Sequence, residues 1–331
     1  MATCPAPLLD AQEDRSFRLL DALARREDAR VLTAGEEGHP VLGRWYRERH
    51  PRRIRPSILY VDTRIEPPPI HAQAIRLLES LSRAYGIRVH RVQPTVEESF
   101  WTNLLGRGYP PPSRKFRWCT KRLKLAPALR FLKRLENPVS LVGTRFSESA
   151  DRRRRLSRTC SPTTGECGTG SLADRLNTSG MPYVAPLLHW STEDVWRFLA
   201  RVAREDDLEL FGLFDLYGDG DLRFGCWTCT LVKRDRSGEA LLARGHRELA
   251  PLLEYRAWLV AEAARGANRY PRPNGVRGRL TLAFRQQALA RLEAVERELG
   301  IPWLSPEERR RIRELWEDPR YGPYPRHGAA R

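Results

Sequence analysis

Short apolar runs alternate with amphipathic stretches along the first half of the chain. The runs are typical of buried strands and lie at 31–33, 57–61, 87–92 and 139–142. Apolar positions recur at helical spacing over 15–30, 70–86 and 121–136. This alternation predicts an α/β fold, with a parallel twisted sheet and helices on both of its faces.

The pattern changes in the second half of the chain. Residues 157–180 are rich in Ser, Thr, Gly and Cys, which predicts a loop. Ser191 is predicted to cap a helix, because Asp194 follows it at the capping-box spacing. A mainly helical pattern then runs to about residue 316, interrupted by a Gly/Pro/Arg-rich loop at 267–280.

Length and composition indicate a globular protein with a strongly basic surface. The 331 residues are 41% apolar and carry 58 Lys and Arg against 41 Asp and Glu, a formal net charge of +17. Such a charge attracts polyanions, with DNA or RNA as the leading candidates, although arginines spread along the whole chain also fit a GC-rich genome. We expect an α/β domain over 1–235 and a C-terminal helical region with a basic tail over 236–331.

The start of the chain lacks the basic and apolar stretches of a secretory signal, and no segment is long enough to span a bilayer. We therefore expect a cytoplasmic protein that does not act at a membrane. Thiols stay reduced in that compartment, so the six cysteines are interpreted as metal or redox ligands rather than structural disulfides.

Two cysteine motifs about a hundred residues apart carry the clearest chemical signal. Cys119 stands in an aromatic and basic stretch, and Cys226 and Cys229 form a Cys-x-x-Cys pair in a similar setting. Such a pair places two sulfurs on one tight turn, where they bind one metal centre or cycle as a disulfide. Because a [4Fe–4S] cluster takes four thiolates, Cys160 or Cys167 in the polar loop is a candidate fourth ligand.

Two other interpretations of these cysteines stay open. Four thiolates satisfy zinc equally well, which makes zinc the second candidate metal. Alternatively, Cys119 is buried as an apolar residue and the Cys-x-x-Cys pair alone is redox-active.

Ligands of parallel α/β proteins bind at the carboxyl ends of the strands, and two predicted ends carry specific candidates. Asp62, Thr63 and Glu66 follow the second predicted strand. A carboxylate there can hold a ribose hydroxyl or a metal ion, or it can cap the next helix. After the last predicted strand, Gly143 allows close approach of a ligand and Arg145 offers a cation to an anion.

The first predicted strand ends at a loop that contains Gly35 and Gly38. Their backbone amides could approach a phosphate at a helix N-terminus. Glu36 and Glu37 stand between them and would repel that phosphate. Taken in isolation, this loop is better explained as an ordinary strand–helix turn.

Taken together, these residues resemble the phosphoadenosine-phosphosulfate reductase family of the PP-loop ATP-pyrophosphatase superfamily. The resemblance covers most of the chain and is closest to the DndC-type proteins of bacterial DNA phosphorothioation systems. Its most specific strings are Phe116-Arg117-Trp118-Cys119-Thr120 and Arg223-Phe224-Gly225-Cys226-Trp227-Thr228-Cys229. The segments at 62–67, 106–110 and 143–149 also match.

The resemblance implies a nucleotide-binding α/β domain, a [4Fe–4S] cluster and sulfur handling directed at a phosphate of the DNA backbone. ATP would activate an oxygen by adenylation, after which sulfur displaces AMP. DNA is then the implied substrate, and a cysteine desulfurase with other Dnd-like proteins are the implied partners.

The chain departs from the family pattern at the PP-loop. The pattern reads Ser-Gly-Gly-Lys-Asp-Ser, whereas the corresponding segment here is Ala34-Gly35-Glu36-Glu37-Gly38-His39. A glutamate replaces the lysine that neutralises pyrophosphate, so we expect weakened or absent ATP pyrophosphatase activity. Longer members also carry cysteines just before the Arg-Phe-Gly string, where this chain has only the short link 217–222.

Three functions follow, in decreasing order of fit. The first is an iron–sulfur sulfurtransferase-like protein of DNA phosphorothioation with a degenerate PP-loop. The second is a non-catalytic nucleotide- or DNA-binding paralogue that scaffolds a DNA modification or defence complex, which Glu37 and the net charge favour. A sulfonucleotide reductase fits least, because it needs a catalytic cysteine in a C-terminal tail and no cysteine follows Cys229.

Overall fold

The computed structural model of the chain describes residues 6–24, 29–34, 38–49, 54–150, 153–154, 183–218, 222, 224–271 and 277–323. The chain divides into two compact units. The first, named the sheet unit, comprises Met1–Tyr60, His71–Val92 and Ala128–Asp221. The second, named the cysteine unit, comprises Val61–Ile70, Gln93–Pro127 and Leu222–Arg331. The predicted domain boundary at residue 235 stays a prediction.

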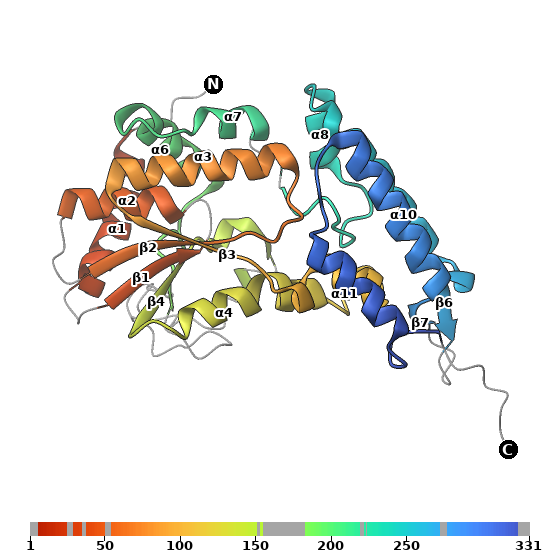
Figure 1. Ribbon diagram of the computed structural model, residues 1–331. Helices are drawn as coiled ribbons and strands as arrows, with labels where there is room; N and C mark the ends of the chain where they lie inside the picture. The colour runs from red at the N-terminus through yellow and green to blue at the C-terminus, as the bar shows by residue number, and fades with distance from the viewer. Residues whose placement is uncertain are drawn as a thin grey trace, which may run out of the picture. The chain divides into compact units, whose positions relative to one another are not determined.

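The sheet unit is built around a five-stranded sheet in the order β3-β2-β1-β4-β5 (Figure 1). Its strands are β1 (Ala29–Ala34), β2 (Ile54–Val61), β3 (Arg88–Val92), β4 (Pro138–Val142) and β5 (Tyr183–Val184). Strand β1 pairs in parallel with both β2 and β4, and β4 pairs in parallel with β5. The register sets Ala34 beside Val142, so β1 and β4 end at the same edge. The predicted α/β fold with a parallel sheet is confirmed for these pairs.

Helices cover both faces of this sheet, as predicted. They are α1 (Ala6–Ala24), α2 (Gly38–Arg49), α3 (Pro68–Tyr85), α4 (Ala126–Leu132), α6 (Thr192–Glu205) and α7 (Phe211–Tyr217). Ile58 of β2 packs into a core with residues of α1, α2, α3 and α6. Its neighbour Leu59 packs on the opposite face against Leu132 of α4, because successive strand side chains alternate between faces. Figure 1 shows α3 and α4 on opposite sides of the strands.

The predicted start of α6 is confirmed. The Ser191 hydroxyl accepts the N–H of Asp194 at 3.0 Å, and the Asp194 carboxylate accepts the N–H of Ser191 at 2.8 Å. This capping box satisfies two backbone donors that no helical carbonyl reaches.

Three other predicted elements differ from the structure or lie outside it. The helix predicted over 15–30 starts earlier, at Ala6, and ends at Ala24. The region predicted as a loop at 267–280 contains the antiparallel strands β6 (Arg269–Pro271) and β7 (Arg277–Leu280). They pair because Leu280 is fully buried and the Arg269 guanidinium donates to the carbonyl oxygen of Gly278 at 2.6 Å. The loop predicted at 157–180 lies outside the described residues.

The cysteine unit combines helices with two π-helical turns. The helices are α8 (Arg236–Ala243), α9 (Ala250–Ala264), α10 (Leu282–Leu299) and α11 (Pro306–Glu317), and the turns are η2 (Thr102–Gly106) and η3 (Thr120–Leu125). Turn η3 leads directly into α4, so the helix predicted over 121–136 is only partly α-helical. π-Helical turns are rare in proteins overall, and those that occur are often found at functional sites.

Buried aromatic rings form the centre of the cysteine unit. The ring of Trp227 lies 5.7 Å from that of Trp101, 6.0 Å from Tyr255 and 5.1 Å from Trp303, measured between centroids. All four side chains are at most 7% exposed. Tilted and edge-on pairs of this kind contribute about 0.5–1.5 kcal/mol each beyond the area that they bury. The Cys-x-x-Cys motif is therefore attached to a buried aromatic cluster.

None of the described helices is both long enough and apolar enough to cross a membrane.

Candidate functional site

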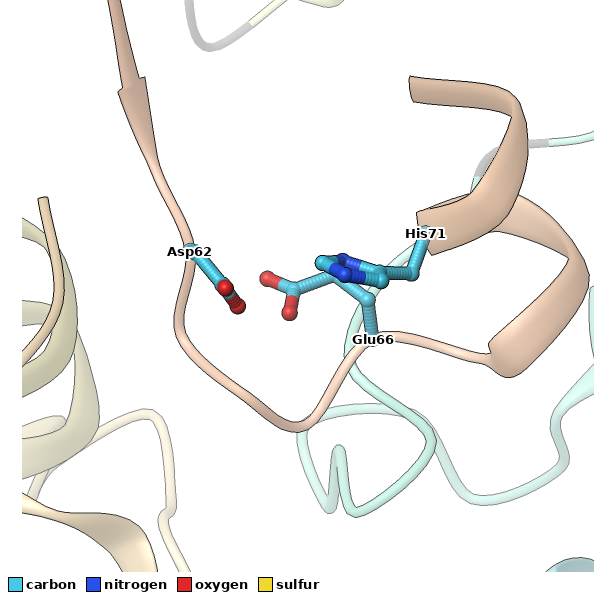
Figure 2. Close-up of side chains that lie close together, drawn as sticks. All are labelled: Asp62, Glu66 and His71. Carbon is cyan, nitrogen blue, oxygen red and sulfur yellow. The ribbon is translucent and has the colours of Figure 1, made fainter. Parts of the chain in front are cut away.

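The loop that follows β2 is folded around the side chain of Asp62, which is 1% exposed. One carboxylate oxygen accepts the backbone N–H of Arg64 at 2.9 Å, and the other accepts a side-chain N–H of Gln93 at 2.8 Å. This Asx turn holds Arg64 at φ 62°, a conformation that is uncommon outside glycine. Figure 2 shows Asp62 and Glu66 on this loop. Helix α3 begins only at Pro68, so the alternative interpretation of Asp62 as its cap is wrong.

Thr63 and Glu66 complete the loop. The Thr63 hydroxyl donates to one carboxylate oxygen of Glu66 at 2.5 Å. The other oxygen of Glu66 is buried and accepts no hydrogen bond from the described residues. Buried carboxylate oxygens are normally paired, so this one is available to a ligand hydroxyl or a cation. The structure thus brings Asp62, Thr63 and Glu66 together, while their binding role stays a prediction.

The Cys-x-x-Cys turn is joined to this loop by backbone and side-chain contacts. The N–H of Trp227 donates to the carbonyl oxygen of Ile65 at 3.0 Å. The Thr63 hydroxyl oxygen lies 3.9 Å from the Cys226 sulfur, and the N–H of Cys229 donates to the Cys226 carbonyl oxygen at 2.9 Å. The second predicted strand end and the cysteine pair therefore form one local structure.

The environment of Cys226 disfavours its action as a free nucleophile. Burial raises the pKa of the Cys226 thiol to about 12, and the nearby charge of Lys124 opposes this shift without reversing it. A thiol that stays protonated at neutral pH is a poor nucleophile. A metal ion displaces that proton when it binds, because only the thiolate is a ligand. Cys226 is therefore a poor free nucleophile, and its role as a metal ligand stays a prediction.

Cys119 belongs to the same unit and immediately precedes η3, the turn that carries Lys124. Cys119, Cys226 and Cys229 are all half-buried free thiols. Among the described residues, no three cysteine sulfurs lie within 4.8 Å of one another. A tetrahedral zinc ion holds its sulfur ligands about 3.8 Å apart. The sulfurs of the described cysteines do not all have this spacing without a bound metal. The convergence of Cys119 on the pair stays a prediction.

Orphaned polar atoms around the cysteine turn fit a sulfur-rich cofactor. The indole N–H of Trp227 and the hydroxyl of Thr228 are buried and have no hydrogen-bond partner among the described residues. The indole N–H groups of Trp101 and Trp303 share this condition. Each unsatisfied buried donor costs about 1–3 kcal/mol, so several in one place indicate a missing acceptor. Hydrogen bonds to cluster sulfurs are a known element of iron–sulfur sites, and these donors fit that need.

Two buried charged side chains support the site, and sequence reasoning gave neither a role. Arg256 of α9 donates to the carbonyl oxygens of Cys229 and Val232, both at 2.7 Å. Glu296 of α10 accepts the backbone N–H of Trp303 at 2.6 Å. A signal for Arg256 was available, because it is a charged residue within the apolar sequence of α9.

The remaining predicted site residues belong to the sheet unit or lie outside the described residues. Gly143 and Arg145 follow β4 in the sheet unit, where Arg145 is 5% exposed. Gly38 starts α2. Gly35, Cys160 and Cys167 lie outside the described residues. Their predicted roles stay predictions.

Known proteins resemble the chain over these same segments. The family model of the phosphoadenosine phosphosulfate reductase domain matches residues 34–232 of the chain. Two uncharacterised proteins of Methanocaldococcus jannaschii, MJ0066 and MJ0973, are 27% and 24% identical to the chain over 181 and 173 residues. These matches cover 54% and 52% of this chain but 31% and 35% of the relatives, so the chain spans about a third of their length. A crystal structure of phosphoadenylyl-sulfate reductase from Candida auris, a phosphate complex, matches 70% of this chain and 99% of that one, with 17% identity and a TM-score of 0.43.

Proposed function

The chain belongs to the phosphoadenosine phosphosulfate reductase domain family, and within it we propose a DndC-type iron–sulfur sulfurtransferase that takes part in phosphorothioation of the DNA backbone. One observation carries the proposal. The Cys226–Cys229 turn is hydrogen-bonded to the Asp62–Glu66 loop, so sulfur ligands and a candidate nucleotide loop share one buried structure.

Each part of this structure has a proposed role. Cys119, Cys226 and Cys229 hold a [4Fe–4S] cluster, with Cys160 or Cys167 as the fourth ligand. When bound, the cluster supplies the sulfur or the electrons for transfer. The unpaired donors of the cysteine turn orient it.

The candidate nucleotide residues would hold the adenine nucleotide that activates the phosphate. In the cysteine unit they are Asp62, Thr63 and Glu66, and the sheet-unit candidates Gly35, Gly38, Gly143 and Arg145 stay separate predictions. Adenylation of a non-bridging phosphate oxygen releases pyrophosphate. Sulfur at the sulfide level then forms the P–S bond, and AMP leaves with that oxygen. A cysteine desulfurase and other Dnd-like proteins are the proposed partners, and DNA is the proposed substrate.

Metal content after anaerobic purification tests the sulfur half of this proposal. The intact chain should contain iron and acid-labile sulfide, and Cys226→Ser should lose most of both. Cys4→Ser, which changes a cysteine outside the two motifs, is the matched control and should keep them. Zinc in place of iron, or no metal, contradicts the cluster. In cells that carry the partner genes, mass spectrometry of digested DNA should find phosphorothioate linkages with Cys4→Ser and none with Cys226→Ser.

A non-catalytic scaffold is the second candidate, and the glutamate at position 37 favours it. ATP–pyrophosphate exchange separates the two functions. Measurable exchange by the intact chain supports the enzyme, whereas DNA binding without exchange supports the scaffold.

A further inference from the structure

The few lysines of the chain gather near its cysteine motifs. Of 58 basic residues only five are lysines, and they stand at Lys115, Lys121, Lys124, Lys133 and Lys233. A GC-rich coding sequence accounts for an excess of arginine everywhere, but not for three of the five lysines falling within thirteen residues. Residues 113–125, named the basic segment, hold three of the five lysines, three arginines and no Asp or Glu.

Five of the six charged side chains of the basic segment are exposed to solvent. Residues 113–117 are all exposed, as are Lys121 and Lys124. Arg114, Lys115, Arg117 and Lys121 form no ion pair or side-chain hydrogen bond with the described residues. Elsewhere in the same unit, arginines such as Arg309 and Arg311 are paired with glutamates. Unpaired cations in a group are the electrostatic footprint of a polyanion site.

The tip of the basic segment is a closed turn. The N–H of Phe116 donates to the Ser113 carbonyl oxygen at 3.1 Å, and the N–H of Ser113 donates to the Phe116 carbonyl oxygen at 3.2 Å. Behind the turn, Trp118 is 6% exposed, and its indole N–H donates to the Pro110 carbonyl oxygen at 2.9 Å. The turn is thus held in place before any partner arrives, which reduces the entropy lost on binding.

An exposed aromatic ring stands among these cations. Phe116 is 44% exposed, although large apolar side chains are usually buried. Its ring lies 5.8 Å from Tyr109, and the guanidinium of Arg122 lies 5.6 Å from the Tyr109 ring centre. A partly exposed ring beside unpaired cations is a combination that binds single-stranded nucleic acid, because a base stacks on the ring while phosphates contact the cations. A duplex hides the faces of its bases, so a single strand fits better.

The basic segment is also continuous with the sulfur site. Cys119 lies within it, and Lys124 is close enough to the Cys226 thiol to act on it electrostatically. A strand that binds here would have a phosphate near the proposed cluster.

We propose that residues 113–125 form the surface that binds a single DNA strand, with Arg114 and Lys115 on phosphates and Phe116 under an unstacked base. The choice of DNA rests on the proposed function. The surface itself rests on the charges and contacts given above.

Fluorescence anisotropy with a labelled 20-nucleotide DNA strand, titrated at several salt concentrations, tests this surface. Arg114→Gln with Lys115→Gln should lower the slope of log K against log salt by about 1.4, since each phosphate contact on a single strand contributes about 0.7. Arg310→Gln with Arg313→Gln removes the same charge from exposed positions of α11 and should leave the slope nearly unchanged. Phe116→Ala should weaken binding about 5- to 150-fold without changing the slope, and Phe116→Tyr should restore it.

Three results would overturn the proposal. They are an equal loss of slope in the α11 control, unchanged affinity in Phe116→Ala, and tighter binding of an RNA strand of the same sequence. Circular dichroism confirms that each variant is folded. Binding is measured without ATP or partner proteins. If the protein contains iron but fails this assay, only the proposed DNA-binding surface is refuted. If it binds DNA but contains no iron, only the proposed cluster is refuted.

Discussion

Glu296 offers a sharp test of how the cysteine unit is held together. Its carboxylate is 8% exposed and accepts the backbone N–H groups of Trp303 and Leu304, at 2.6 and 2.8 Å. Trp303 in turn packs against Trp227 of the cysteine turn. Removing the carboxylate by Glu296→Ala leaves two buried donors without an acceptor. At about 1–3 kcal/mol for each donor, the variant should lose about 2–6 kcal/mol of unfolding free energy.

The neighbouring Glu293 provides a matched control. Glu293 and Glu296 both form ion pairs with Arg309, but among the described contacts only Glu296 also accepts backbone N–H groups. The Glu293 side chain is 28% exposed, and a pair of this kind contributes at most about 1 kcal/mol. The difference between Glu296→Ala and Glu293→Ala therefore isolates the two backbone hydrogen bonds.

Urea unfolding followed by tryptophan fluorescence measures both variants, and hydrogen exchange locates the effect. A local loss of 2 kcal/mol increases opening about thirty-fold, so the Trp303 and Leu304 amides should exchange at least that much faster in Glu296→Ala. Equal losses of stability in the two variants, with unchanged exchange at these amides, would refute the assigned role of Glu296.

Two further predictions concern backbone conformation and pH. Gly108→Ala should cost about 1–3 kcal/mol in urea unfolding, because Gly108 has φ 74° and an added Cβ would lie 3.0 Å from the Leu280 carbonyl oxygen. Gly86→Ala, at φ 64° in open space, should cost only about 1 kcal/mol, and an equal cost at both sites would contradict this reasoning. Burial, with a smaller contribution from Arg15, lowers the pKa of His189, so the unfolded chain takes up a proton more readily. Stability should therefore fall as pH decreases through the range below about 6.5, and His189→Phe should flatten that part of the unfolding profile.

Local pattern was sufficient for some elements of the sheet unit. The capping box at Ser191 and the apolar run that becomes β2 depend on neighbours in sequence, and both are present in the structure. The union of the Asp62 loop with the cysteine turn was not derivable from spacing. It depends on a hydrogen bond between Ile65 and Trp227, which are separated by most of the sheet unit in sequence.

The buried charged side chains beside the site, Arg256 and Glu296, were not predicted from the sequence for a related reason. Arg256 and Glu296 act on backbone groups that are distant in sequence or beyond the end of their helix, and periodicity does not encode such partners. The strands β6 and β7 were hidden by their Gly, Pro and Arg content. Their pairing depends on a guanidinium that bridges them and on the burial of Leu280.

Under the proposed function, the distribution of these contacts predicts that iron binding and ATP turnover are separable. The described partners of the Cys226 side chain, Thr63, Glu66, Lys124 and Cys229, all belong to the cysteine unit, and the altered loop at 34–39 does not. Reversed charge at position 37 should therefore weaken pyrophosphate binding without loss of the cluster.

Glu37→Lys restores the lysine of the family pattern and tests this separation. The substitution should increase ATP–pyrophosphate exchange, because a cation replaces an anion beside the phosphates. Glu36→Lys adds the same charge one residue away and should increase the exchange less. Iron and sulfide content should be the same in both variants as in the intact chain. A change of iron content in Glu37→Lys would refute the predicted separation, and an equal increase of exchange in both variants would refute the role assigned to position 37.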